Sequence, residues 1–327
     1  MPQVETLGGP IEVDGLGTVL MHEHVIVLTP EIQSAYPGFG GWDPDRYVAE
    51  AQAKLAALKE RGVDTIVDLT VVGTGRDVEL LARCAEGTGL QIVVATGIYT
   101  YDAVPKPFHF VGPGTILGGD DERMIQMFVD DIEQGIQGTG VKAGILKCAT
   151  DASGMTEGVE RVVRAVAQAH RRTGVPISTH TAARDERGLE QQRVFEEEGV
   201  DLSRVVIGHS GDTTDLDYLE KLIAAGSYIG MDRFGIDVEL PFEERVTTVV
   251  ELCERGHANR MVLSHDAAAF MDFLPWEMVP TVLPNWHYTH IHDDVLPALR
   301  ERGVSDEQID QMLVGNPREI FSRGEPY

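Results

Sequence analysis

Eight short segments rich in apolar and β-branched residues recur along the chain, and longer stretches with helical spacing separate them. Within the segments, apolar and polar residues do not alternate strictly, which is typical of parallel strands buried on both faces. The segments are 18–21, 65–69, 92–96, 143–148, 176–179, 205–207, 228–231 and 261–264. A chain that alternates strands and helices in this way is expected to fold as an α/β protein.

The stretches between the segments place apolar residues three and four positions apart, as the buried face of a helix requires. In 47–61, the spacing of Val48, Ala51, Leu55 and Leu58 gives one apolar stripe. Glycine follows four of the expected helices, which fits the left-handed residue that commonly ends a helix. The helices are expected at 47–61, 124–136, 159–172, 189–198, 216–225 and 242–255.

Eight βα units favour a (β/α)8 (TIM) barrel, in which a parallel sheet closes on itself. The alternative is an open doubly wound sheet. Such sheets usually have fewer strands, and no GxGxxG motif follows the first segment of this chain. Because neither a repeat nor a Pro/Ser-rich linker marks a boundary, residues 1–327 are expected to form a single domain.

The net charge of −26 argues against nucleic acid and anionic membrane as partners, because both are polyanions. No apolar run approaches the roughly 20 residues of a membrane span, and the first 15 residues lack the pattern of a signal peptide. The three cysteines lie far apart, as expected for reduced thiols rather than a disulfide framework. These features predict a cytoplasmic protein.

Polar side chains follow five of the predicted strands at their carboxyl ends, where the active sites of barrels form. Taken singly, a strand-end histidine is often a hydrogen-bonded core residue, and Asp266 could be a helix cap. His22 and His24, however, are two positions apart, so both rings point to the same side of a strand. Imidazole and carboxylate are ligands of zinc and similar ions, so the joint placement predicts a metal site. Its candidate ligands are His22, His24, Lys147, His180, His209 and Asp266.

Lys147 interrupts an apolar strand, and burying its ammonium group would be costly. One interpretation is an ion pair with a nearby acid. The other is that two nearby metal ions depress the pKa of Lys147, so that its neutral amine adds carbon dioxide. The resulting carbamate would supply an anion that bridges the two metals.

The order of these residues resembles the phosphotriesterase family of the amidohydrolase superfamily, and the resemblance spans nearly the whole chain. Within the family, the chain is most similar to the phosphotriesterase-like lactonases. The strings that carry the resemblance are MHEH (21–24), AGILKCAT (143–150), PISTHT (176–181), GLEQQRVFEEEGVD (188–201), VVIGHSGDT (205–213), GMDRFGID (230–237), VLSHD (262–266) and NPREIF (316–321).

The resemblance implies a lactonase that hydrolyses N-acyl homoserine lactones, a quorum-quenching activity, and related lactones. It implies a side activity on organophosphate triesters, and the alternative is that triester hydrolysis is the principal activity. It also implies a homodimer and two divalent metal ions, zinc or else cobalt, iron or manganese. The implied ligands are His22, His24 and Asp266 for one ion and His180 and His209 for the other, with N6-carboxylated Lys147 and an attacking hydroxide bridging them.

The resemblance also assigns roles to residues around the metals. Tyr99 matches a tyrosine near the hydroxide, Arg233 matches an arginine at the substrate mouth, and Asp266 is positioned to transfer the proton. The chain departs from its relatives at Ser210 and at 267–269, where three alanines stand. Relatives often have cysteine where Ser210 stands, and cysteine or an aromatic residue among the residues that follow Asp266. These departures therefore concern specificity.

The stretch 267–287 is unusually apolar, and its large aromatic residues include Phe270, Phe273 and Trp276. It is expected either to pack as a satellite core or to form a hydrophobic lid that binds the acyl chain. The loop 99–110 is expected to supply another wall of the site or a dimer interface. His265 is expected to be structural. The histidines expected to lie outside the metal site are His109, His170, His257, His287, His290 and His292.

Two other classes of protein are less consistent with the residues. A scaffolding protein that has lost catalysis would not need all six ligand positions to be filled. Deaminase-type amidohydrolases generally use one metal and lack the lysine, so Lys147 argues against that class.

Overall fold

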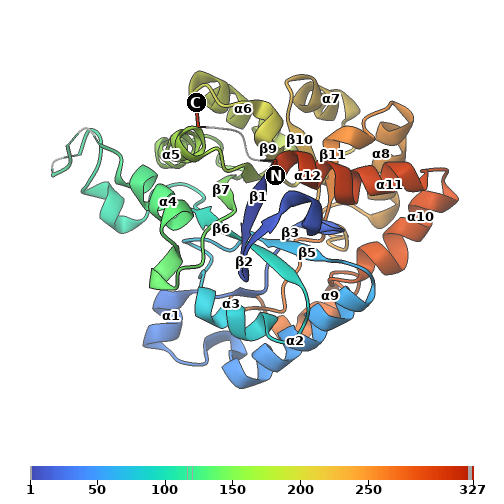
Figure 1. The fold of residues 1–327 in the computed structure, drawn as a ribbon, viewed down its shortest axis with the longest axis horizontal. Helices are drawn as coiled ribbons and strands as arrows, with labels where there is room; N and C mark the ends of the chain where they lie inside the picture. The colour runs from blue at the N-terminus through green and yellow to red at the C-terminus, as the bar shows by residue number, and fades with distance from the viewer. Residues whose placement is uncertain (1, 116, 120, 323–325) are drawn as a thin grey trace.

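The structure is a computed structural model that describes residues 2–115, 117–119, 121–322 and 326–327. Its centre is an eight-stranded parallel sheet surrounded by helices (Figure 1). Neighbouring strands of the sheet follow one another in the chain, which confirms the (β/α)8 barrel. The strands are β3 (Val19–Glu23), β5 (Thr65–Asp68), β6 (Gln91–Gly97), β7 (Ile145–Thr150), β8 (Ile177–Thr181), β9 (Val205–Ile207), β10 (Tyr228–Met231) and β11 (Met261–Leu263).

Hydrogen bonds just beyond the strands close the barrel between β3 and β11. Asp266 N donates to the His22 carbonyl at 3.0 Å, and His24 N donates to the Ala267 carbonyl at 2.9 Å. A short parallel pair, β4 and β12, continues this seam. The closure therefore brings the ends of the first and last barrel strands, and the candidate ligands on them, side by side. β4 spans Ile26–Val27, and β12 spans Phe270–Met271.

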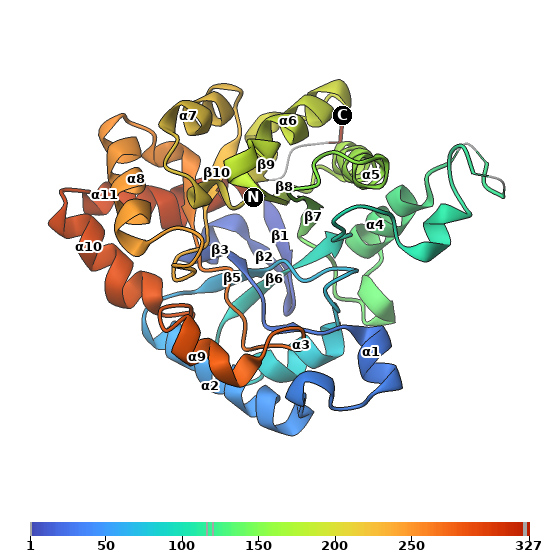
Figure 2. The same ribbon diagram turned by 180° about the vertical axis from the view of Figure 1, so that it is seen from behind.

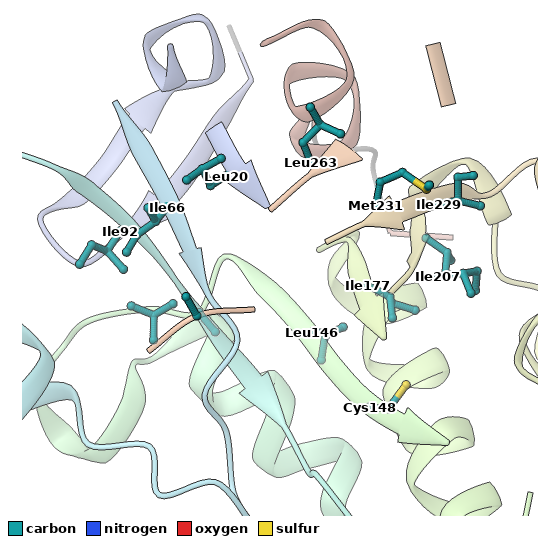
Figure 3. Packing of buried hydrophobic residues seen from close by; sticks show 14 of the residues in the cluster. Leu20, Ile66, Ile92, Leu146, Cys148, Ile177, Ile207, Ile229, Met231 and Leu263 are labelled. Carbon is teal, nitrogen blue, oxygen red and sulfur yellow. The ribbon is translucent and has the colours of Figure 1, made fainter. Parts of the chain in front are cut away.

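Successive strand residues pack on opposite faces of the sheet. Val19 and Met21 belong to the barrel interior, whereas Leu20 between them packs toward the helices. Ile66 and Val67 divide in the same way. Figure 3 shows side chains of the outer layer, including Leu20 and Ile66. Because both faces are apolar, the strand sequences show continuous apolar runs rather than alternation.

All six expected helices form, with ends within three residues of those expected. Asp43 accepts hydrogen bonds from backbone N–H groups at the start of α2, and Thr156 does so at the start of α5. The longer helices are α2 (Pro44–Glu60), α3 (Val78–Ala85), α4 (Arg123–Glu133), α5 (Glu157–Thr173), α6 (Arg187–Glu197), α7 (Leu216–Ala224) and α8 (Phe242–Glu254). The shorter helices are α1 (Pro30–Ala35), α9 (Val279–Val282), α10 (Leu296–Glu301), α11 (Asp306–Asp310) and α12 (Asn316–Phe321).

An N-terminal hairpin, which the sequence analysis does not predict, covers the end of the barrel opposite the candidate ligands (Figure 1). Val4 packs in the barrel interior, and Leu7 N donates to the carbonyl of Ile92 near the start of β6 at 2.8 Å. The hairpin therefore leaves open the end of the barrel that carries the candidate ligands. The hairpin consists of β1 (Gln3–Thr6) and β2 (Gly9–Glu12).

On the side of the molecule seen in Figure 2, away from the hairpin, α9 lies beside α2. The ammonium of Lys54 lies 5.6 Å from the ring centroid of Trp276, which joins the segment before α9 to α2.

Among the described helices, none has both the length and the apolar character to cross a membrane. The cysteines Cys84, Cys148 and Cys253 are buried and not joined to one another.

Candidate metal centre at the barrel mouth

Four imidazole rings meet at the carboxyl ends of the strands. His22 stacks on His209 with ring centroids 4.6 Å apart, and His180 meets His209 edge-on, also at 4.6 Å. The ring of His24 lies 5.7 Å from that of His22. The HxH spacing on β3 therefore turns both rings into the mouth, as the sequence indicates.

Asp266 lies among these rings. Its Oδ1 is 3.2 Å from His24 Nε2 and 3.4 Å from His22 Nε2, and its Oδ2 is 3.7 Å from His209 Nε2. One donor atom each from His22, His24 and Asp266 lie within 4.8 Å of one another, a spacing at which one ion could be held. Although burial disfavours its charge, the neighbouring His22 and His209 hold the pKa of Asp266 well below its usual range.

The other nitrogen of three rings is anchored behind the site. Asp232 accepts from His22 Nδ1 at 2.8 Å and from His209 Nδ1 at 3.0 Å, one with each carboxylate oxygen. His24 Nδ1 lies 2.8 Å from Thr70 Oγ1. With the proton on Nδ1, each Nε2 presents a lone pair toward Asp266.

The protonation states suit a metal site. Burial and the nearby Lys147 lower the pKa of His22 to about 4. Burial and Arg233 hold the pKa of His209 well below 6.5. Metal ions bind neutral imidazole, so these rings are ready to act as ligands at neutral pH. The donor set and its protonation therefore fit divalent ions of the zinc type.

His180 on β8 has the opposite orientation. Its Nε2 lies 3.0 Å from Asp151 Oδ2, and its Nδ1 lies 3.1 Å from the hydroxyl of Tyr99. Burial lowers the pKa of His180 as well. The nitrogen that His180 presents toward the cavity side is therefore Nδ1, whereas the other three rings present Nε2.

Lys147 is buried on β7 and has no carboxylate partner within 4.0 Å among the described residues. Its Nζ lies 3.0 Å from His22 Nε2 and 3.3 Å from the carbonyl of Thr179. Burial lowers the pKa of Lys147 to about 8. The ion pair that would have explained this lysine is therefore not formed, and its amine faces a histidine of the candidate site.

Backbone geometry fixes two of the candidate ligands. His209 and Asp266 have φ values of 58° and 54°, in the left-handed region that residues other than glycine rarely adopt. Such residues cluster at functional sites, because surrounding structure must hold them there. At Gly97, which pairs with Lys147, a Cβ would lie 1.9 Å from the Lys147 carbonyl oxygen. Glycine is therefore required for β6 to approach β7 at the lysine.

Arg233 connects Asp266 to a further acid. Its Nε donates to Asp266 Oδ2 at 3.0 Å, and its Nη1 donates to Asp212 Oδ2 at 3.0 Å. Arg233 and Tyr99 both line the cavity, as the resemblance implies. Burial raises the pKa of Tyr99, so its hydroxyl keeps its proton and remains a donor.

A cavity of about 510 Å³ opens above the rings. Its lining includes the six candidate ligands together with Tyr99, Thr100 and Tyr101. Six further lining residues are apolar, which suits an elongated apolar group. These residues, called the apolar wall below, are Val27, Ile236, Met271, Phe273, Leu274 and Trp286.

The aromatic residues expected to bind substrate divide into two groups. Phe273 lines the cavity and is 60% exposed. Phe270 is fully buried in β12 against Tyr47, with centroids 4.1 Å apart, so a direct substrate contact is the wrong expectation for it. Trp276 packs on Phe270 and on the cavity residue Trp286. In the part of the chain that the structure describes, Trp276 does not line the cavity itself. The physical reason is that β12 pairs with β4 and turns Phe270 toward the helices.

His265 lies behind the site, as expected. Its Nδ1 is 2.6 Å from Glu23 Oε1, and its Nε2 accepts from Ile291 N at 2.9 Å. His170 and His257 also have structural partners, at Tyr327 and Glu220 respectively.

Sequence reasoning missed four residues that hold the site: Asp232, Thr70, Asp151 and Asp212. Each follows a predicted strand within a few residues, which is a signal that could have drawn attention to it. Their partners come from other strands, however, so their roles become apparent only in the closed barrel.

Comparison with known proteins identifies relatives along the whole chain. The model of the phosphotriesterase family matches residues 2–321. The solved structure of the phosphotriesterase from Mycobacterium tuberculosis is 62% identical, covers 100% of both chains and superposes with a TM-score of 0.97. An aryldialkylphosphatase of Saccharolobus solfataricus is 38% identical over 95% of this chain and 97% of its own. A structure from the engineering of organophosphate hydrolysis in a weak promiscuous lactonase template is 34% identical, covers 98% and 99% of the two chains, and has a TM-score of 0.89.

Proposed function

Since the chain belongs to the phosphotriesterase family, we propose that it is a metal-dependent lactonase that hydrolyses N-acyl homoserine lactones and related lactones. Organophosphate triesters would be its side substrates. The named aryldialkylphosphatase relative is a hydrolase, which agrees with the reaction class.

The observation that carries this proposal is the asymmetry of the cavity. The six polar ligands lie together in its lining, and four of its apolar residues, Val27, Met271, Leu274 and Trp286, belong to one packed hydrophobic cluster. A substrate with a compact electrophilic head and one long apolar tail fits both parts. A triester with three short arms would leave much of the apolar wall uncovered.

We propose two divalent ions per chain, zinc or else cobalt, iron or manganese. When bound, they would polarise the carbonyl or phosphoryl oxygen and lower the pKa of water, so that a hydroxide is available at neutral pH. The proposed ligands are His22, His24 and Asp266 for one ion, His180 and His209 for the other, and N6-carboxylated Lys147 for both.

The chain's own residues would move the proton and stabilise charge. Attack by the water-derived oxygen forms a bond to the carbonyl carbon, and the ring C–O bond breaks. Asp266 would accept the proton and pass it to the leaving alkoxide, because its carboxylate is ionised and faces the cavity. Arg233 holds this carboxylate in place, and the Tyr99 hydroxyl would donate a hydrogen bond to the negative oxygen.

The alternative is that triester hydrolysis is the principal activity. The aryldialkylphosphatase relative favours it, whereas the relationship to a promiscuous lactonase template favours lactones. The same residues suit both reactions, because each develops negative charge on one oxygen. The homodimer and the cytoplasmic location stay predictions.

The test is a series of kcat/KM values for acyl homoserine lactones of increasing chain length, simple γ- and δ-lactones and one chromogenic phosphotriester. Each methylene that becomes buried contributes about 0.8 kcal/mol, so kcat/KM should rise up to about fourfold per methylene until the wall is covered. Asp266→Asn serves as the inactive control, with a loss of roughly 10²–10⁴-fold expected.

Two results would contradict the proposal. Triester turnover far above that of every lactone would establish phosphotriesterase as the principal activity. Full activity of Asp266→Asn with an unchanged metal content would move proton transfer to another residue.

A further inference from the structure

A second group of potential metal ligands lies outside the cavity, on the segment that follows Trp286. One donor atom each from His287, His290 and Asp294 lie within 4.8 Å of one another. His290 Nδ1 is 2.8 Å from Asp294 Oδ2, and the rings of His287 and His290 are 5.7 Å apart. Both histidines lie outside the strand-end pattern of the mouth ligands, so the proposed lactonase reaction does not use this group.

Local helical geometry brings the three side chains together. The π-helix Ile291–Val295 contains Asp294 and begins directly after His290, which itself has helical φ and ψ of −56° and −38°. His287 lies in the turn before it, where His290 N donates to the His287 carbonyl at 3.2 Å. The cluster therefore results from a continuous stretch of backbone.

His290 is the buried member of the cluster. Its side chain is 2% exposed, and Nδ1 is the atom that faces Asp294. A metal ion bound there would take the place of the proton that Nδ1 shares with the Asp294 carboxylate, because metal ligands bind in their deprotonated form. Asp294 is 55% exposed at its side chain and His287 is exposed, so the cluster opens to solvent and an ion can enter.

We propose that His287, His290 and Asp294 form a separate site for one divalent transition-metal ion. Two imidazoles and one carboxylate suit zinc, nickel or copper, whereas calcium and magnesium prefer ligand sets of oxygen. Three protein donors leave a position for water. Partial burial of the ring and the neighbouring His290 lower the pKa of His287, which keeps this ring neutral and able to bind a metal.

The site is connected to the catalytic end of the barrel. Ile291 N donates to His265 Nε2 at 2.9 Å, and Trp286 Nε1 donates to the carbonyls of His265 and Asp266, each at 3.1 Å. An ion bound to the cluster would hold the segment that positions Trp286 against the cavity. Because it binds only the folded chain, it would raise the unfolding temperature.

The experiment uses the full chain with its mouth centre saturated and loosely held metal removed by dialysis. Zinc is then titrated by calorimetry, and cobalt by its visible absorption. The variants are His287→Ala and Asp294→Asn, because both residues are exposed. The matched control is His257→Ala, a partly exposed histidine paired with Glu220 on another part of the surface.

The native chain and His257→Ala should each bind one ion more than the saturated mouth centre holds. In His287→Ala and Asp294→Asn the affinity for this ion should fall at least about tenfold, since even an outer partner of a ligand contributes that much. Zinc should raise the unfolding temperature of the native chain and of the control, but not of His287→Ala.

Absence of further zinc binding by the native chain would overturn the proposal, as would equal binding by the native chain and both cluster variants. A His24→Ala chain separates this result from the proposed function, because it should lose metal at the mouth and still bind the additional ion. Failure of lactone hydrolysis would leave the additional site unaffected.

Discussion

The environment of Lys147 leaves few ways to stabilise a lysine side chain. Its nearest polar atoms are an imidazole nitrogen at 3.0 Å and a carbonyl oxygen at 3.3 Å. An ammonium group there would compete with a metal for His22 Nε2. The amine pKa of about 8 leaves part of the population neutral, and only the neutral amine can add carbon dioxide.

We therefore predict that Lys147→Ala loses metal and activity together. The loss of kcat/KM should exceed the roughly 10–100-fold that removing an outer partner of a metal ligand costs. Metal analysis should give about two ions per native chain, as a two-metal site requires, and fewer in the variant. Short carboxylic acids should restore part of the activity. The control is Lys142→Ala, just before the same strand, which should behave like the native chain. A Lys147→Ala chain that holds two ions at full activity would exclude the bridging carbamate.

Asp232 holds one histidine of each proposed metal pair with a single carboxylate. In Asp232→Asn, the amide group would turn an N–H donor toward either His22 Nδ1 or His209 Nδ1, both of which are donors. Metal affinity should fall about 10–100-fold. Competition with a chelator measures this directly, and exposed Asp217→Asn is the control. An unchanged affinity would mean that the rings keep their orientation without Asp232.

The six candidate ligands could be proposed from the sequence, because each lies within or just after a strand that an apolar run reveals. Asp232 also follows such a strand, but it stands beside Arg233 and has no neighbouring histidine in the chain. Its partners lie on β3 and β9, which approach β10 only when the barrel is closed. Contacts of this kind depend on tertiary structure and have no local sequence pattern.

Among the elements, the segment after β11 combines both interpretations of its apolar sequence. Phe270 packs in the core, whereas Phe273, three residues later, lies at the cavity. The sequence could not separate the two, since the segment has neither helical nor strand periodicity over its length. Pairing of β12 with β4 decides which side chains face inward.

We predict that alanine lowers a different quantity at each of these two positions. Phe273→Ala should lower kcat/KM for long-chain lactones more than for short ones, by about fourfold for each methylene that loses contact. Phe270→Ala should instead lower the free energy of unfolding by about 3–5 kcal/mol, measured with urea. Met278→Ala, equally exposed on the same segment but not in the lining, is the control for Phe273. A Phe273→Ala chain with native activity at every chain length would exclude the acyl-binding wall.

The eight strands and six of the helices could be predicted because they are long or continuously apolar. Helix α3 has only eight residues, and its buried Val78, Leu81 and Cys84 give too short a pattern to recognise. The hairpin β1–β2 has two strands of four residues, and β2 contains Pro10. Its stability comes from packing on the barrel, which local propensity does not report.

At the scale of the whole molecule, closure of the barrel depends on one buried carboxylate. Glu23, at the end of β3, is fully buried and accepts four hydrogen bonds from the chain after β11. The donors are Ser264 Oγ at 2.8 Å, His265 N at 3.0 Å, His265 Nδ1 at 2.6 Å and Ala267 N at 2.9 Å. These bonds lie beside the seam that positions Asp266 opposite His22 and His24.

The charge state of Glu23 follows from these partners. Burial raises the pKa of Glu23 and favours the neutral acid, whereas the hydrogen bonds from Ser264, Ala267 and His265 lower the pKa and favour the carboxylate. His265 must carry its proton on Nδ1, because its Nε2 accepts from Ile291 N. A carboxyl proton on Glu23 would meet three N–H donors, and the Ser264 hydroxyl, which could accept it, already accepts from His22 N. We conclude that Glu23 closes the barrel as a carboxylate.

Glu23→Gln tests this conclusion, since it keeps the shape of the side chain and replaces one acceptor oxygen with a donor. We expect the free energy of unfolding to fall by about 3 kcal/mol, the contribution of a hydrogen bond to a buried charge together with the cost of an unpaired donor. Urea unfolding at neutral pH measures the change, and exposed Glu12→Gln is the control. Metal affinity at the mouth should fall as well, because the seam holds Asp266 against the histidines. A glutamine variant as stable as the native chain would show instead that Glu23 carries its proton in the folded barrel.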